Sequence, residues 1–574
     1  MANQRIFLWA ALALVLWLNY QAWQSDHAPK SVPVVESPAT TSPANPAAPV
    51  QPPAGLGDTV PQASEPGQAQ TNAAVPASAV PQATTAAPAQ ESSGSPEVRV
   101  VTDVLDVDIG LKGGTLQRAD LLKYPEHKDQ PGLVRLFEDA PGKPIYVLQT
   151  GLTSAGSGPQ ANHLAEYSAP KREFRLAAGS GQLRVPLTWT DDKGVTVTKT
   201  FTFERGNYKV KVDYDIRNQS GAPYQAASYV QFLKQQTKHK RSMFDVGSYA
   251  FVGPALYDGT KYSKLDIEDE EDRAFQSSIT NGWLAGLQHH FVAAAVPAKD
   301  QPYLYRLQVK DGQFLLSAVG PTQSIAPGGS GAISETLFIG PKLQQQLEAT
   351  GPELDRTADY GKLTIIARPL FVLLGWIHEL VGNWGWAIVI VTILIKLAFY
   401  PLSEASGRSM AKMRALAPRI KNIQERYKDD REQLGRAMME LYKREKINPL
   451  AGCLPIVIQI PVFLAFYWVL LESVEMRQAP FMLWINDLSS RDPWFILPIL
   501  MGLAMFGQYK LNPAPPDPVQ AKVFMFMPVI MTVMFMWFPA GLVLYWLTNT
   551  VLSIAQQWRI NRVVEAQQKK KKSE

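Results

Sequence analysis

One apolar stretch constrains the fold of this chain most: residues 385–402 read GWAIVIVTILIKLAFYPL. At about 1.5 Å of rise per residue, a helix of this length comes close to crossing the roughly 30 Å hydrocarbon layer of a membrane. Lys396 lies inside the stretch, where an ionised group costs roughly 2.5 kcal/mol or more unless it faces protein or water. Thr392 lies one turn earlier on the same face, so we predict a transmembrane helix with one polar stripe. The alternative is that Lys396, close to Pro401, only reaches to the near membrane surface as an anchor.

The N-terminal 96 residues predict an anchor followed by a tether. Residues 6–23 are apolar and follow Arg5, and no convincing small-residue cleavage site comes after them. We therefore favour an uncleaved transmembrane anchor (1–25) with a cytoplasmic N-terminus over a signal peptide. Residues 26–96 are rich in Ala, Pro, Ser, Gln and Thr and contain no aromatic residue, so we expect a disordered spacer without a motif.

Short strands dominate residues 97–341. In residues 195–203, apolar residues and Lys199 alternate with four threonines, the period-two pattern of a strand, and residues 310–313 predict a hairpin turn. The length of this region indicates a large β-sandwich. His289 and His290 precede a buried-strand pattern, and neighbours on a strand point to opposite faces, so we expect a structural pair and a poor metal site.

The last third of the chain predicts a membrane domain. Residues 342–381 predict a linker and an amphipathic helix in the membrane interface, because Arg368 and Glu379 interrupt its apolar residues. Residues 382–402 predict transmembrane helix 2, and residues 451–558 predict helices 3 to 6. With the anchor this gives six spans, both termini in the cytoplasm and the large domain outside.

Two basic segments follow the membrane helices. Residues 403–450 carry twelve Lys or Arg against seven Asp or Glu and predict a cytoplasmic helical hairpin, with a second helix capped near Asp430. Residues 559–574 predict a basic cytoplasmic tail that contains Lys569, Lys570, Lys571 and Lys572. This charge suits lipid headgroups, nucleic acid, a ribosome or topology control alone; the interleaved acidic residues argue against a nucleic-acid surface.

The sequence contains no catalytic, phosphate-binding or zinc-protease motif, and its one cysteine, Cys453, excludes an internal disulfide and a thiolate metal cluster. We expect no enzyme activity, no cofactor and no metal. Instead, isolated polar residues in apolar helices indicate a hydrated groove, each alone being more typical of helix–helix contacts: Thr392, Lys396, Gln459, Gln508, Thr532, Thr548 and Asn549. Methionines on the fifth span are able to adapt to varied apolar partners, or simply contact core and lipid: Met525, Met527, Met531, Met534 and Met536.

Several motifs in the membrane part closely resemble the YidC membrane protein insertases of Gram-negative bacteria, which are related to the Oxa and Alb insertases. The resembling stretches are 381–385 (VGNWG), 410–414 (MAKMR), 448–453 (NPLAGC), 477–481 (RQAPF) and 537–542 (WFPAGL). The resemblance covers residues 363–562 closely, and the anchor, tether and β-domain match in layout. It implies a multi-domain membrane protein with a five-helix insertase core and an external domain like the galactose mutarotase supersandwich.

The resemblance also implies a function and partners. Members of this family insert nascent inner-membrane proteins and act as chaperones, alone or with the Sec translocon and its accessory subunits, and ribosomes dock near the hairpin and tail. No small-molecule substrate and no nucleic-acid specificity are implied. The hydrophilic groove of the family maps here to Lys396, Thr392 and Tyr545, with Lys396 in place of the usual arginine, which keeps the charge but loses the planar fork of donors. Substrates would slide along the third and fifth spans.

Two other functions stay open from the residues alone. A small-solute transporter would favour inverted repeats, which the sequence does not show. An external carbohydrate-active enzyme on a membrane anchor would need a catalytic pair and leaves five further spans unexplained.

Overall fold

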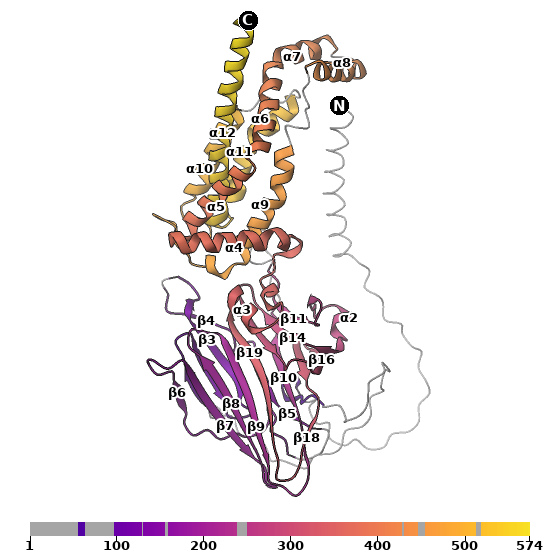
Figure 1. Cartoon of the computed structure of the whole chain (residues 1–574), viewed down its shortest axis with the longest axis vertical. Coiled ribbons are helices and arrows are strands. Elements are labelled where there is room, and N and C mark those ends of the chain that lie inside the picture. The colour runs from indigo at the N-terminus through magenta and orange to yellow at the C-terminus, as the bar shows by residue number, and fades with distance from the viewer. Residues whose placement is uncertain are drawn as a thin grey trace, which may run out of the picture.

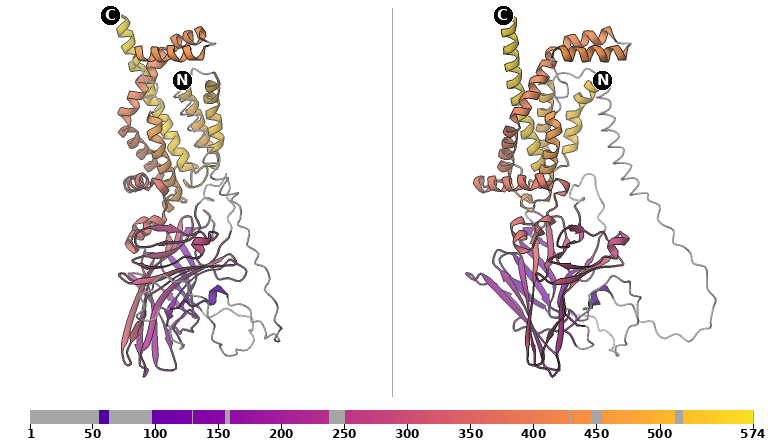
Figure 2. Two further views of the ribbon diagram at one scale, coloured as in Figure 1. Left: turned by 90° about the vertical axis from the view of Figure 1, so that its right-hand side faces the viewer. Right: turned by 45° about the vertical axis from the view of Figure 1, so that its right-hand side comes forward.

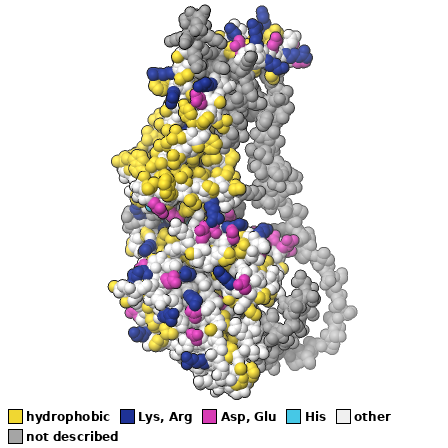
Figure 3. Space-filling view, in the orientation of Figure 1, with side chains coloured by type: hydrophobic (Ala, Val, Ile, Leu, Met, Phe, Trp, Pro, Cys, Tyr) yellow, Lys and Arg dark blue, Asp and Glu magenta, His cyan; other side chains and the backbone are white. Residues whose placement is uncertain are grey.

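The computed structural model describes residues 55–62, 97–128, 130–154, 159–237, 250–427, 430–445, 454–511 and 518–573. The predicted anchor, most of the predicted tether and Cys453 lie outside these residues. The described chain forms a β-domain at one end and a bundle of helices at the other (Figures 1 and 2). The space-filling view shows hydrophobic side chains gathered over the bundle, whereas charged side chains are spread over the β-domain (Figure 3).

The β-domain is a sandwich of two sheets, as predicted. Its strands are β1 (Glu97–Val101), β2 (Leu105–Gly110), β3 (Thr115–Pro125), β4 (Leu133–Arg135), β5 (Tyr146–Thr153), β6 (Glu173–Arg175), β7 (Gln182–Thr190), β8 (Val195–Glu204), β9 (Lys209–Asn218), β10 (Tyr224–Gln235), β11 (Gly253–Tyr257), β12 (Tyr262–Lys264), β13 (Gln276–Thr280), β14 (Trp283–Leu287), β15 (Phe291–Val296), β16 (Pro302–Lys310), β17 (Gln313–Val319), β18 (Gln323–Ile325) and β19 (Ser330–Pro341). An eleven-stranded sheet has the order β13-β16-β17-β10-β5-β3-β2-β1-β6, with β18 on β10 and β4 on β3. An eight-stranded sheet has the order β12-β11-β14-β15-β19-β9-β8-β7. Apolar side chains from the facing sides of both sheets form one core.

Local sequence rules explain several of these strands. β8 buries alternate residues, and Lys199 is one of them. The three hydrogen-bond donors of the Lys199 ammonium all have partners, because it donates to the carbonyls of Gly113, Gly114 and Thr150. The predicted turn between β16 and β17 has Asp311 and Gly312 at positive φ, which is the geometry of a two-residue hairpin loop.

The prediction for the histidine pair is wrong in its geometry. His289 and His290 lie in the turn between β14 and β15, not on the strand, and their rings stack at 3.9 Å instead of pointing to opposite faces. The predicted buried-strand pattern does begin at Phe291, where β15 begins, so the alternation rule, which holds only within a strand, does not apply to the two residues before it.

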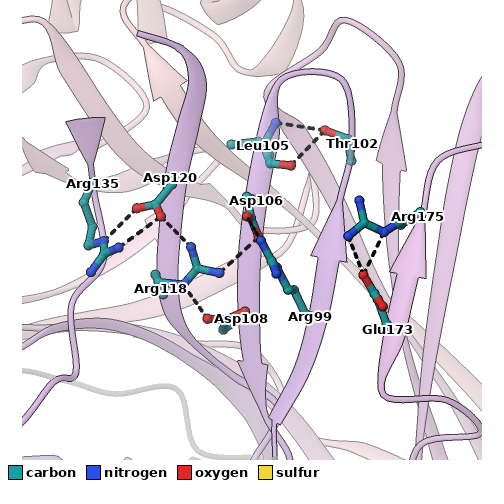
Figure 4. Close-up of polar contacts among 10 residues, drawn as sticks. All are labelled: Arg99, Thr102, Leu105, Asp106, Asp108, Arg118, Asp120, Arg135, Glu173 and Arg175. Atoms are coloured by element: carbon teal, nitrogen blue, oxygen red, sulfur yellow. Dashed lines mark hydrogen bonds and ion pairs between the residues drawn. The ribbon is translucent and has the colours of Figure 1, made fainter. Parts of the chain in front are cut away.

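The outer face of β1 to β4 carries a ladder of ion pairs (Figure 4). Arg118 bridges Asp106, Asp108 and Asp120, while Arg99 pairs with Asp106 at 2.6 Å. Burial acts to raise the pKa of Asp106, but the hydrogen bonds and charges of Arg99 and Arg118 outweigh it and hold the pKa below its usual value. These carboxylates are therefore structural partners within the sheet.

Two short helices, α2 (Glu270–Arg273) and α3 (Gln344–Thr350), belong to the β-domain and its exit. The helical part contains α4 (Thr364–Val381), α5 (Trp384–Ala398), α6 (Tyr400–Ala415), α7 (Ala417–Arg426), α8 (Arg431–Arg444), α9 (Leu454–Glu472), α10 (Ile496–Leu511), α11 (Pro518–Phe535) and α12 (Ala540–Ser573). Helix α4 runs across the end of the bundle that faces the β-domain, and the α7–α8 hairpin projects from the opposite end (Figures 1 and 2). Asp430 caps α8 by accepting from the backbone N–H groups of Glu432 and Gln433, as predicted.

Helix boundaries in the membrane part differ from the prediction in two places. The helix predicted over 382–402 ends at Ala398, and α6 begins at Tyr400 after a bend of 63°. Pro401 has no N–H to continue the α5 ladder, so it sits in the first turn of the next helix. The basic tail predicted after residue 558 is helical through Ser573, as a continuation of α12.

Few of the described helices are both long enough and apolar enough to cross a membrane by themselves. Only α4 is long and apolar enough by itself, and the bent pair Trp384–Ala398 and Tyr400–Ser409 qualifies together. The other apolar helices are shorter: Gln459–Glu472, Ile496–Leu511 and Lys522–Phe535. Although α4 passes this test, it lies across the bundle and exposes an apolar face containing Ile365, Val372, Trp376 and Leu380. This arrangement is typical of an interfacial helix.

Candidate functional site

The start of α5 is fixed by local capping. Gly382 ends α4 in the left-handed region (φ 66°), and the Asn383 side chain accepts from the backbone N–H of Trp386. Its amide nitrogen donates to the carbonyl of Phe481 at 2.9 Å. A Cβ at Gly385 would lie 2.0 Å from the Phe481 ring, so only glycine allows this packing. These contacts hold the first turn of α5 against the loop that joins α9 and α10.

Thr392 and Lys396 lie further along α5, on one face of the helix. Thr392 is 1% exposed, and its hydroxyl donates to the carbonyl of Ile388 at 2.6 Å, so it is satisfied within its own helix. Lys396 is half-buried one turn later, and no described residue gives its Nζ a hydrogen bond or an ion pair. Lys396 is therefore a basic side chain on an apolar helix with no polar partner among the described residues.

A second polar group joins α9 to α12. Gln459 donates from Nε2 to Oδ1 of Asn549 at 2.8 Å, and its side chain also bonds with Tyr545. The Tyr545 ring packs against Phe463 and Phe466 at centroid distances of 6.0 and 4.8 Å. Thr548 is half-buried on α12, the helix that also carries Tyr545 and Asn549. Sequence reasoning placed Asn549 among the polar residues but missed that it pairs with Gln459.

Helix α11 exposes most of the side chains that the structure describes along it. It packs on α10, where Thr532 lies so close to Gly502 that a Cβ there would be 1.9 Å from the hydroxyl. Met525 and Met534 are exposed, whereas Met527 and Met531 are half-buried. The four predicted contact methionines therefore do not share one environment, and only two of them are freely accessible.

A compact loop covers the end of the bundle that faces the β-domain. The N–H of Ala540 donates to the carbonyl of Ser490, and the N–H of Gly541 donates to that of Leu488. Asp492, 1% exposed, accepts from the backbone N–H groups of Trp494 and Leu497. The sequence predicts this connection between spans but not its hydrogen bonds to the start of α12, because those join residues about fifty positions apart.

The same loop contacts the β-domain. Gln478 donates to the carbonyl of Pro125 at 3.0 Å, and Arg477 donates to that of Glu126 at 2.8 Å. Nearby, Lys342 donates to the carbonyl of His289, and burial lowers the pKa of Lys342 to about 8, against the opposing charge of Glu472. Polar contacts therefore join the two parts, and Val474 from the same loop is buried in the core of the sandwich.

The described residues contain no group of three or more His, Cys, Asp or Glu side chains that would hold a metal ion.

The backbone of Lys569, Lys570, Lys571 and Lys572 lies in the last turns of α12, but their side chains lie outside the part that the structure describes. The α7–α8 hairpin closes on a small apolar cluster of Leu416, Ile420 and Met438.

Sequence comparison decides the family. Residues 376–569 match the family model of the 60Kd inner membrane protein, and residues 97–373 match that of the YidC periplasmic domain. A membrane protein insertase YidC from Nitrosococcus oceani is 45% identical over 568 residues, which are 98% of this chain and 99% of the relative. The chain belongs to the YidC family of membrane protein insertases. It is an inner-membrane protein, and the sandwich lies in its periplasmic domain.

Comparison of solved structures adds two similar chains. An active YidC insertase with its first transmembrane domain resolved is 19% identical, with a TM-score of 0.35, and the match covers 81% of this chain and 92% of that one. A galactose mutarotase-like protein from Lactobacillus casei is 9% identical, with a TM-score of 0.28, and the match covers 42% of this chain and 99% of that one. Scores this low add nothing to the family relationship.

Proposed function

We propose that this chain, an insertase and not an enzyme, inserts inner-membrane proteins and helps them fold by means of a hydrophilic groove within the membrane. The proposed lining is Lys396, Thr392, Gln459, Tyr545 and Thr548. The observation that carries the proposal is Lys396, half-buried on an apolar helix and without a hydrogen bond or ion pair among the described residues. A cation kept in such a place favours an acidic or polar ligand.

The physical logic is that a substrate must move a polar segment across a layer where each unsatisfied polar group costs several kcal/mol. A groove that accepts this segment from the cytoplasm shortens the remaining apolar path. The loop that bonds Ser490 and Leu488 to the start of α12 supports closure on the periplasmic side. The chain therefore would hold the segment without opening a continuous channel.

The apolar part of the substrate would leave along the exposed surfaces of α9 and α11. Ile460 and Leu464 are exposed on α9, and Met525 and Met534 are exposed on α11. Met527 and Met531, which are half-buried on α11, would line the same path beneath the exposed methionines. Burial of the substrate helix in lipid then drives its release.

We also propose the topology and partners that go with this function. The chain would cross the membrane six times with five core helices and both termini in the cytoplasm. Its parts would be an anchor (1–25), a tether (26–96) that contacts the sandwich through residues 55–62, a periplasmic sandwich (97–341), a linker and interfacial helix (342–381), transmembrane helix 2 (382–402) with its bend at Phe399, a hairpin (403–450), helices 3 to 6 (451–558) and a tail (559–574). Partners would be nascent membrane proteins, the Sec translocon, lipids and, through the hairpin and tail, the ribosome.

Reconstitution tests the function. The purified chain in liposomes should insert a newly made single-span protein with a short exported segment, detected as protection of that segment from added protease. Empty liposomes and liposomes with an unrelated membrane protein are the controls. Protection no greater than in these controls would contradict the proposed function.

A further inference from the structure

Residues 55–62, which lie within the predicted disordered spacer, pack against the periplasmic β-domain. Residues 55–62, which contain the short helix η1 (Leu56–Asp58), lie against the outer face of the eleven-stranded sheet. That face belongs to three neighbouring strands, β17, β10 and β5. The opposite face of these strands, with Leu148, Phe232 and Leu316, belongs to the sandwich core. The eight residues therefore cover the face of β17, β10 and β5 that points away from the sandwich core.

The strands present their outward side chains in rows that the segment follows in order. Val147, Leu233 and Leu315 are register partners in one row, and Leu56 packs on them. Tyr229 and Val319 form a row further along, and Val60 packs there together with Ala227. Two aliphatic side chains four positions apart thus enter two apolar patches.

Polar side chains between the patches bind the backbone of the segment. The Gln149 amide donates to the carbonyl of Gly57 at 3.3 Å, and the Gln231 amide donates to that of Thr59 at 3.2 Å. The Thr153 hydroxyl donates to the carbonyl of Pro61 at 2.8 Å. All of these contacts are to main-chain carbonyls of η1 and of the residues after it, so they bind the backbone of the segment independently of its side chains.

A histidine completes the set. The Tyr229 hydroxyl accepts from the backbone N–H of His163 and lies 2.6 Å from its Nδ1, so its own proton points to Nδ1. That arrangement leaves the proton of the ring on Nε2, which donates to the carbonyl of Gly57 at 3.1 Å. Burial lowers the pKa of His163 to about 4, which keeps the ring neutral at physiological pH. Oε1 of Gln231, fully buried, has no hydrogen-bond partner among the described residues and would accept one further N–H.

We propose that this face of the sheet is a binding site for peptide segments that carry two aliphatic residues four positions apart, the first in a single helical turn, and that residues 55–62 occupy it in cis as a releasable latch. When the latch is closed, it anchors the tether to the periplasmic domain at residues 55–62. When it is open, the site takes another peptide of the same chemistry. The site is independent of the groove in the membrane domain.

Competition for the site tests the latch in the full-length protein in detergent. The probe is a fluorescent synthetic peptide of residues 53–64 (PAGLGDTVPQAS), and its binding is followed by anisotropy. The proteins are the wild type, Leu56→Asp/Val60→Asp, and the matched control Val75→Asp/Val80→Asp, whose valines also precede prolines in the tether. A tethered segment acts at an effective concentration on the order of millimolar, so it should weaken peptide binding to the wild type and the control by about tenfold or more.

The expected result is therefore tight binding to Leu56→Asp/Val60→Asp alone, abolished when the peptide itself carries Asp at both aliphatic positions. Because the substitutions lie in the tether, they leave the sheet intact, and circular dichroism of all three proteins should be the same. Equal binding to the three proteins, no binding to any, or equal binding of the Asp peptide would overturn the proposal.

Discussion

The charge of Lys396 gives the sharpest prediction for the proposed groove. If an Asp carboxylate of a substrate comes within 4 Å of its Nζ, the attraction is about 1 kcal/mol in water and about 4 kcal/mol at an effective dielectric of 20. A half-buried lysine in a wet groove lies near the lower end of this range. Because 1.4 kcal/mol corresponds to a tenfold change, Lys396→Ala should reduce insertion by about five- to tenfold per acidic residue.

The assay measures insertion of a model substrate whose exported segment carries zero, one or two Asp residues, normalised to the amount of insertase. Lys396→Arg should work as the wild type does, and Lys396→Glu should fail for the acidic substrates. Lys510→Ala is a matched control, because Lys510 lies at the end of α10 over the Phe506 ring and outside the proposed groove. If Lys396 is only an anchor, alanine should be silent and glutamate should mainly lower protein abundance. Equal insertion of the three substrates by the wild type and Lys396→Ala would refute the charge model.

Three further predictions follow from other parts of the chain. Deletion of most of residues 97–321 should leave insertion working, measured by complementation of a depletion strain, because the proposed groove residues all lie after residue 363; loss of insertion by an abundant, folded membrane part would count against it. Replacing Lys569 to Lys572 with Gln should weaken ribosome co-sedimentation most at low salt, since exposed charges are screened within about 10 Å at 0.1 M; binding unchanged at every salt concentration would argue otherwise. Gln459→Leu should destabilise the protein in detergent by roughly 0.5–2 kcal/mol, and the double variant with Asn549→Leu should show coupling of similar size in thermal unfolding; simple additivity would mean that the pair is not coupled.

Elements that depend on a periodic or local sequence pattern were predicted correctly. The alternation in β8 gave the strand and its buried face, and the polar residues between β16 and β17 gave the hairpin. Asp430 gave the start of α8 because a cap is a local interaction between a side chain and the next few N–H groups. The candidate groove residues also came from a local contrast, a polar side chain in an apolar helix.

Features that depend on distant contacts were missed. Leu56 and Val60 are isolated aliphatic residues in a Pro-rich run, and nothing local shows that β5, β10 and β17 offer them two patches. The bend at Phe399 was missed because the apolar run continues past it to Leu402, although Pro401 was a helix-break signal. Composition alone gave no reason to pair Gln459 with Asn549, whose positions differ by ninety residues.

The central claim is that substrates leave the groove along α9 and α11, and site-specific photocrosslinking tests it most directly. A photoreactive residue would be placed at Ile460 on α9, at Met534 on α11, and at the control position Leu503 on α10, all apolar and exposed. Ribosome-bound nascent chains, arrested with one hydrophobic segment emerging, would then be irradiated. The account predicts crosslinks from Ile460 and Met534 that fade once the chain is released, and few from Leu503. Crosslinks that are strongest at Leu503, or equal at all three positions, would contradict it.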